Sequence, residues 1–103
     1  MKEKLLQIAE DINAISVFNR DTYDGYKKTV IYIRTLLENL RQQHNDPILA
    51  IWTEMGIKEL NNELNQRFNE AFLQQDKERQ KIEFTYSKST VLLTLNNIIM
   101  NLK

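Results

Sequence analysis

Apolar residues recur at spacings of three and four over most of the chain, and the clearest run lies between residues 23 and 40. It consists of Tyr23, Tyr26, Val30, Ile33, Leu37 and Leu40, with lysines, an arginine and other polar residues between them. An α-helix of about 3.6 residues per turn places such positions on one face and the charges outside it. The pattern predicts an all-α protein, an antiparallel four-helix bundle, that forms a single domain over residues 1–103.

The first predicted helix runs from about Lys2 to Phe18, with an apolar face formed by Leu5, Ile8, Ala9, Ile12, Ile15 and Phe18. The segment Asn19-Arg20-Asp21 then breaks the pattern. We expect Asp21 to cap the second helix, with Asp24 completing a turn like a capping box. This second helix is predicted to continue to about Gln42.

The third predicted segment begins at Asp46-Pro47, after a loop at Gln43-His44-Asn45. A capping carboxylate followed by proline at the first helical position is a strong start signal. Gly56 either ends a short helix or lies inside a longer one that extends to Gln80. The apolar period resumes after it with Ile57, Leu60, Leu64, Phe68, Ala71 and Phe72. Residues 74–81 contain no apolar side chain and are predicted to form a solvated helix end.

The last helix is predicted to start at Ser87 or Ser89, either of which could cap it. The preceding segment Glu83-Phe84-Thr85-Tyr86-Ser87 is expected to be extended or to form a turn. The helix itself should bury Val91, Leu92, Leu95, Ile98, Ile99 and Leu102.

Composition narrows the class of protein. The chain is 42% hydrophobic and 27% charged, with two Gly, one Pro and no Cys, which suits a helical globular domain. The 14 basic residues balance the 14 acidic ones, and this balance disfavours a dedicated nucleic-acid binder without excluding a local basic patch. No apolar stretch approaches the roughly 20 residues that span a bilayer. We therefore expect a cytoplasmic protein.

The candidate metal and catalytic sites lack residues that their chemistry requires. If Gly25 held the sixth position of a calcium loop, Arg20 would be first and Ile31 last, and neither is a suitable ligand. Di-iron bundles need two Glu-x-x-His pairs, and this chain has one histidine, His44. No serine, cysteine or second histidine lies at a spacing from His44 that would suggest a catalytic pair. We expect no metal, no cofactor and no enzymatic activity.

The most polar segment, residues 76–81, is either a solvated helix end or part of a surface that binds a protein partner. The second interpretation is suggested by the aromatic residues beside it, because aromatic and arginine side chains supply most interface hot spots. The candidate partner-binding residues are Arg79, Lys81, Phe84, Tyr86 and Lys88.

Two stretches resemble the immunity proteins that protect lactic acid bacteria from pediocin-like (class IIa) bacteriocins. One is Leu36-Leu37-Glu38-Asn39-Leu40-Arg41-Gln42-Gln43 followed by Pro47-Ile48-Leu49, which is similar to the family's second helix, turn and third-helix start. The other is Lys81-Ile82-Glu83-Phe84-Thr85, which is similar to the entry into the family's fourth helix. The resemblance implies a cytoplasmic four-helix bundle that recognises the membrane mannose phosphotransferase engaged by a bacteriocin, and it places specificity at residues 79–88.

Two other functions are open. The protein could be a small chaperone or adaptor that holds an amphipathic helix of a partner, with Leu92, Leu93, Ile99 and Met100 lining the groove. An inhibitor of a nucleic-acid enzyme would need an acidic face, which the balanced charge does not favour. A monomer or a weak dimer is expected, since the stripe over residues 57–72 could also pair between chains.

Overall fold

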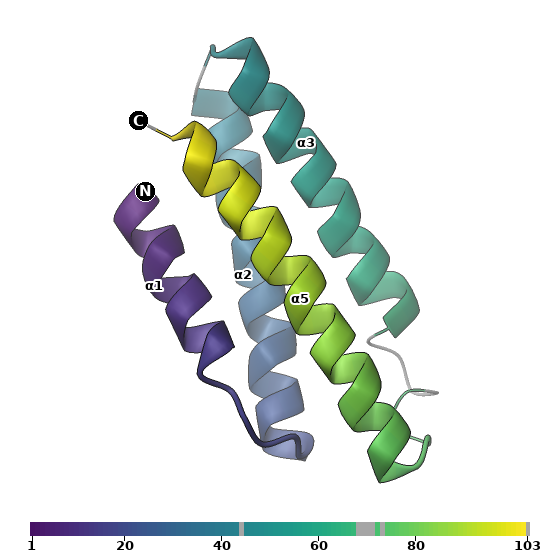
Figure 1. Ribbon diagram of the computed structural model, residues 1–103. Coiled ribbons are helices and arrows are strands. Elements are labelled where there is room, and N and C mark those ends of the chain that lie inside the picture. Colours follow the sequence, from purple (N-terminus) through teal and green to yellow (C-terminus); the bar gives the residue numbers. More distant parts are fainter. Residues whose placement is uncertain (44, 68–71, 73, 103) are drawn as a thin grey trace.

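The computed structural model describes residues 1–43, 45–67, 72 and 74–102. These residues form an all-α bundle of four helices, namely α1 (Lys2–Asn13), α2 (Arg20–Gln43), α3 (Pro47–Asn62) and α5 (Lys77–Asn101). A π-helical turn, η1 (Glu63–Arg67), follows α3 directly. Consecutive helices run in opposite directions, and the start of α3 lies at the same end of the bundle as the end of α5 (Figure 1). The predicted all-α helical bundle is confirmed.

The predicted stripe of α2 is buried along its whole length. Val30, Ile33 and Leu37 are fully inaccessible to solvent, and Tyr23, Tyr26 and Leu40 are nearly so. Together with the inner faces of α1, α3 and α5 they form one continuous core, whose buried apolar members are Leu5, Ile8, Ile12, Tyr23, Tyr26, Val30, Ile33, Leu36, Leu37, Leu40, Leu49, Ile57, Leu60, Phe72, Phe84, Val91, Leu95, Ile98 and Ile99. Burial of this apolar surface is the main force that holds the helices together.

Helix α1 ends at Asn13, earlier than the predicted Phe18. The run Ile15-Ser16-Val17 favours an early end, because β-branched residues and serine have lower helix propensity than the residues before them. The chain leaves the helix there and carries Phe18 to an aromatic cluster. The ring of Phe18 lies 5.6 Å from Phe72 and 4.9 Å from Phe84, measured between centroids.

The start of α2 is capped by Asn19, so the prediction that Asp21 caps it and Asp24 completes the box was wrong. The backbone N–H of Thr22 donates to Asn19 Oδ1 (2.9 Å), and the backbone N–H of Asn19 donates to Thr22 Oγ1 (2.8 Å). This reciprocal pair is a capping box displaced by two residues from the predicted one. Helix α2 then continues through Gln43, which was predicted to be in the loop.

The start of α3 follows the prediction. Asp46 is the N-cap, with Pro47 in the first turn, and its carboxylate accepts hydrogen bonds from the backbone N–H groups of Ile48 and Leu49. Gly56 does not end the helix. It lies where α3 approaches α2 and α5 closely, since a Cβ built on it would be 3.0 Å from the terminal methyl groups of both Leu37 and Ile98.

The predicted continuation of the third segment to Gln80 was wrong. Residues 68–71, with Phe68 and Ala71, lie outside the described residues, but Asp76 has extended backbone and caps a new helix at Lys77. The polar residues 77–81 are therefore the first turns of α5 and not the end of the third segment.

Helix α5 also begins ten residues before the predicted cap Ser87, so the expected extended segment at residues 83–87 is helical. Phe84, Ser87 and Val91 continue the inner stripe of the helix, and all three are buried. The hydroxyl groups of this segment are compatible with a helix because they bond to carbonyls one turn earlier. Thr85 Oγ1 donates to the carbonyl of Lys81 (2.9 Å), and Ser89 Oγ donates to that of Thr85 (3.1 Å).

Candidate protein-binding surface

The five residues predicted to bind a partner lie on the first half of α5, but the structure does not bring them together on one surface. Phe84 is only 4% exposed and its ring packs 5.0 Å from that of Tyr26, centroid to centroid. Tyr86, two residues later, is 65% exposed. Residues two apart on a helix point to nearly opposite sides, so Phe84 belongs to the core and cannot contribute to a surface with Tyr86.

Lys88 also has a structural role. Its ammonium group donates a hydrogen bond to the carbonyl oxygen of Ile15 and lies 5.7 Å from the centroid of the Phe84 ring. It therefore fixes the irregular segment between α1 and α2 against α5. A half-buried cation held by a carbonyl and an aromatic face is poorly available to a partner.

Arg79 and Lys81 are exposed on different sides of α5. Arg79 pairs with Glu83 one turn later at 3.8 Å and lines a shallow depression with Ile82 and Tyr86. Lys81 faces a separate depression formed with the α1–α2 connection, which Val17 and Arg20 also line. Of the predicted set, only Arg79 and Tyr86 share one face.

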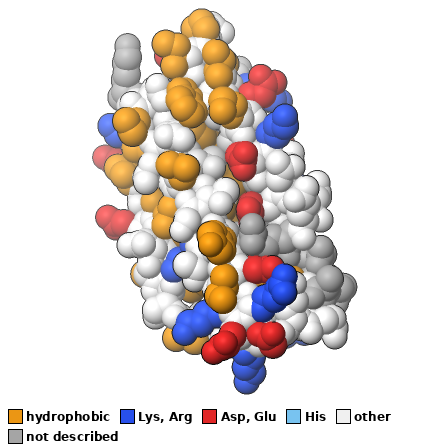
Figure 2. Space-filling model, turned by 45° about the vertical axis from the view of Figure 1, so that its right-hand side comes forward, with side chains coloured by type: hydrophobic (Ala, Val, Ile, Leu, Met, Phe, Trp, Pro, Cys, Tyr) orange, Lys and Arg blue, Asp and Glu red, His pale blue; other side chains and the backbone are white. Residues whose placement is uncertain are grey.

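A larger apolar surface lies over α3 and α5, toward the opposite end of α5. The first half of α3 exposes Ile48, Ile51 and Met55, and the second half of α5 exposes Leu93 and Met100. Figure 2 shows apolar side chains gathered over one end of this face and continuing as a narrower line toward the other end, where charged side chains surround them. Exposed apolar patches of this kind mark interaction surfaces more often than an isolated exposed leucine does.

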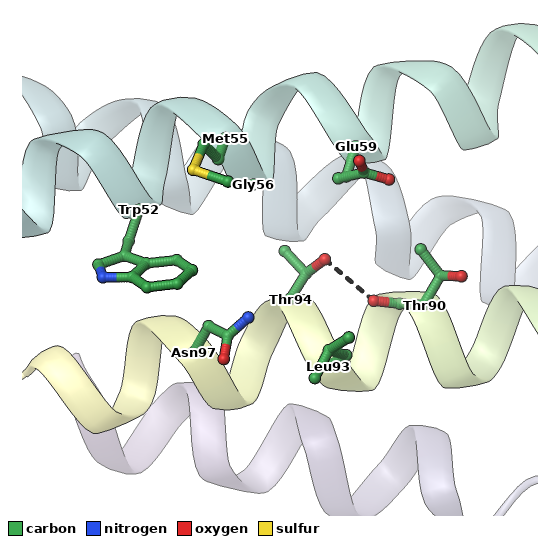
Figure 3. Close-up of a pocket in the computed structure, with 8 residues that line it drawn as sticks. All are labelled: Trp52, Met55, Gly56, Glu59, Thr90, Leu93, Thr94 and Asn97. Atoms are coloured by element: carbon green, nitrogen blue, oxygen red, sulfur yellow. Dashed lines mark hydrogen bonds between the residues drawn. The ribbon is translucent and has the colours of Figure 1, made fainter.

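The groove between the two helices, which we call the α3–α5 groove, encloses a pocket of about 350 Å³. Its walls are Trp52, Met55, Gly56 and Glu59 on α3, and Thr90, Leu93, Thr94 and Asn97 on α5. The indole of Trp52 extends from α3 toward α5 at one end of the groove, and Glu59 lies near the other (Figure 3). Thr94 Oγ1 donates to the carbonyl oxygen of Thr90 (2.9 Å), which leaves its methyl group available to the groove.

Part of this groove could be found from the sequence. Among the residues suggested to line a helix-binding groove, Leu93 does so and Met100 is exposed nearby, whereas Ile99 is buried and Leu92 packs against the core. The contribution of α3 was missed. The available signal was the repeat of Ile48, Ile51 and Met55 at spacings of three and four.

Within the described part of the chain, no three His, Cys, Asp or Glu side chains are placed to hold a metal ion. No helix in that part has both the length and the apolar character to cross a membrane. Comparisons with protein-family models, with curated proteins and with solved structures give no match to this chain.

Proposed function

We propose that this protein acts by stoichiometric binding to a protein partner and that it is an immunity protein against pediocin-like bacteriocins. The observation that carries the first part is the apolar face over α3 and α5, which combines exposed Met55 and Leu93 with the half-buried Trp52. Such a face suits recognition of a protein better than turnover of a small polar substrate. The protein is accordingly not an enzyme.

The immunity assignment is supported by where the residues of the resemblance lie in the fold. Lys81-Ile82-Glu83-Phe84-Thr85 lies one turn after the start of the last helix, with Phe84 anchoring that helix in the core. Leu37 and Leu40 belong to the second helix, and Pro47 opens the third. This layout corresponds to the one that the resemblance implies. The site of action would be the cytoplasmic face of the membrane, where the mannose phosphotransferase carries a bound bacteriocin.

A protection assay tests the proposal. The chain would be expressed in a bacteriocin-sensitive lactic acid bacterium, which is then challenged with a panel of pediocin-like peptides. We expect resistance to one or a few peptides, and loss of that resistance in Leu93→Asp at unchanged protein level. Leu6→Asp is the matched control, because Leu6 is an exposed leucine on α1 that does not line the groove. Full sensitivity to the panel with folded protein present would refute the immunity assignment.

The adaptor alternative is favoured by one observation, namely that α5 carries exposed apolar residues along its outer face while its inner face is fully packed. A chaperone that holds a partner's amphipathic helix would use such a surface. A pull-down from cells lacking any bacteriocin system, with Leu93→Asp as the negative control, distinguishes the adaptor from the immunity protein. A partner that the parent protein retains in these cells and Leu93→Asp does not would favour the adaptor.

A further inference from the structure

Helix α5 carries a second stripe on its outer face, at the regular spacing of a helix–helix seam. Its members follow one another at alternating intervals of three and four residues, and all are exposed. They are Arg79, Ile82, Tyr86, Ser89, Leu93, Asn96 and Met100. A stripe of this spacing matches the a and d positions through which one helix packs along another. The apolar members Ile82, Tyr86, Leu93 and Met100 are 57–81% exposed, so the described residues leave most of their surface uncovered.

The length of the stripe fits a helical ligand. From Ile82 to Met100 the outer face spans about 27 Å at about 1.5 Å per residue, which corresponds to about five turns of a partner helix. Beside the second half of this stripe, α3 supplies the other wall of the α3–α5 groove with Trp52 and Met55. Methionine adapts to differently shaped ligands, and both Met55 and Met100 are exposed at this face.

The charges beside the groove indicate the sign of the charge that a ligand should carry. Glu59 is the one charged residue among those described that line it, and no described residue pairs with its carboxylate. Helix α5 has no charged residue from Ser89 to Asn101. A ligand with a Lys or Arg beside its apolar stripe would therefore gain an ion pair in the groove, whereas an acidic ligand would face an unpaired carboxylate.

We propose that the α3–α5 groove binds a basic amphipathic helix of another protein, with the ligand's apolar stripe on Leu93, Trp52 and Met55 and a basic side chain against Glu59. A second copy of this chain fits less well, because the part of α5 that lines the groove, from Ser89 to Asn101, has no basic residue to pair with Glu59 across a symmetric contact. This inference rests on the proposed function and specifies the kind of partner.

Trp52 provides a built-in reporter, because it is the sole tryptophan of the chain and lies in the groove. Two tryptophan-free model peptides of about 18 residues would be titrated against the protein. Both have a leucine stripe, which is flanked by lysine in one and by glutamate in the other. A third peptide scrambles the lysine sequence so that no apolar face forms. We expect the lysine peptide alone to shift the Trp52 emission strongly, with an affinity about tenfold or more above that of the glutamate peptide.

Paired variants locate the binding. Glu59→Gln should remove most of the preference for the lysine peptide, while Lys58→Gln, its exposed neighbour outside the pocket, should retain it. Leu93→Asp should abolish binding and keep the parent's circular dichroism and melting temperature, since the side chain is exposed. Leu6→Asp should bind like the parent.

Three outcomes would overturn the inference. They are equal affinity for the lysine and glutamate peptides, binding that survives Leu93→Asp, and binding of the scrambled peptide as tightly as the ordered one. Sedimentation of the protein alone provides a further check, because a dimer that Leu93→Asp dissociates would assign the groove to a second copy. If the peptides do not bind but the protein still protects cells, the groove proposal is wrong and the immunity proposal stands. If the lysine peptide binds but the protein does not protect cells, the immunity proposal alone is wrong.

Discussion

Helices α2 and α5 are almost equal in length, with 24 and 25 residues, but they use their surfaces differently. In α2 the principal apolar stripe points inward, and charged residues such as Lys28 separate its members along the sequence. The large apolar side chains that α2 exposes, Ile31 and Tyr32, are only 39% and 44% exposed. In α5 the inner face is equally well packed, around Val91 and Leu95, yet apolar side chains also occupy the outer face. The difference indicates that α2 stabilises the bundle, whereas α5 both stabilises it and presents a binding surface.

A helix that is apolar on two faces is normally covered on both. The described residues leave the outer stripe of α5 largely uncovered, and Met100 at its end is 81% exposed. Stability alone does not require such residues, because exposed apolar side chains contribute little to the core and increase the risk of aggregation. The outer face of α5 is therefore the part of the molecule whose sequence is better explained by a ligand than by the fold.

The largest expected effect separates the two faces of α5 directly. Phe84→Ala should lower the free energy of unfolding by about 3–5 kcal/mol, because the ring is buried among Phe18 and Tyr26 and its removal leaves a cavity. Tyr86→Ala, on the outer face, should change it by less than about 0.5 kcal/mol. Urea denaturation of both variants measures the difference. Similar losses in the two would contradict the orientation of α5.

The second expected effect tests the stripe of α2. Leu37→Ala should cost about 2–5 kcal/mol, since Leu37 is fully buried and its Cδ1 lies where α3 comes closest at Gly56. Leu93→Ala removes the same number of atoms from the exposed face of α5 and is the matched control, with an expected change below about 0.5 kcal/mol. A Leu37→Ala protein that melts with the parent would show that the orientation of α2 is wrong.

The contrast between α2 and α5 also decided how much of the fold could be predicted. The stripe of α2 is bounded by charges, so its periodicity could be read with the correct face. In α5 the residues of the two stripes alternate along the sequence. The run Phe84-Thr85-Tyr86 therefore has the apolar–polar alternation of a β-strand, and the sequence does not show that Phe84 faces the core and Tyr86 the solvent. The hydrogen bond between Tyr26 Oη and Ser87 Oγ (3.0 Å), which joins residues 61 apart in the sequence, explains why a buried serine suits the helix interior.

The candidate surface was predictable only in part for the same reason. Proximity in sequence grouped Phe84 and Lys88 with Tyr86, although the helix turns them to different sides. The groove depends on Trp52 of α3 meeting Leu93 of α5, and no local pattern encodes that two distant helices pack side by side. The Asp46 cap was predicted correctly because Pro47 beside it marks the start of a helix, whereas the caps predicted at Asp21 and Ser87 had no such marker and were wrong.

A smaller effect tests where α5 begins. Asp76→Ala should lower the free energy of unfolding by about 1 kcal/mol, because Asp76 Oδ1 accepts a hydrogen bond from the backbone N–H of Arg79 (2.8 Å) at the N-cap. Asp46→Ala, at the corresponding cap of α3, should have a similar cost and serves as the reference. If α5 began instead at Ser87 or Ser89, as the sequence suggested, the Asp76 change would have almost no effect in urea denaturation.

The smallest effect on the free energy of unfolding is expected at Lys77, the residue after Asp76. Lys77 is the exposed first residue of α5, and none of the described residues accepts an ion pair from its ammonium group. A cation in the first turn opposes the helix dipole slightly, so Lys77→Ala should change the free energy of unfolding by no more than about 0.5 kcal/mol, in the stabilising direction. Repeating the measurement at high salt should shrink the change further, because screening weakens the interaction with the dipole. A clear loss of stability in Lys77→Ala would instead mean that this end of α5 depends on a contact of Lys77, and it would contradict the view that the stability of α5 comes from its inner face and its cap.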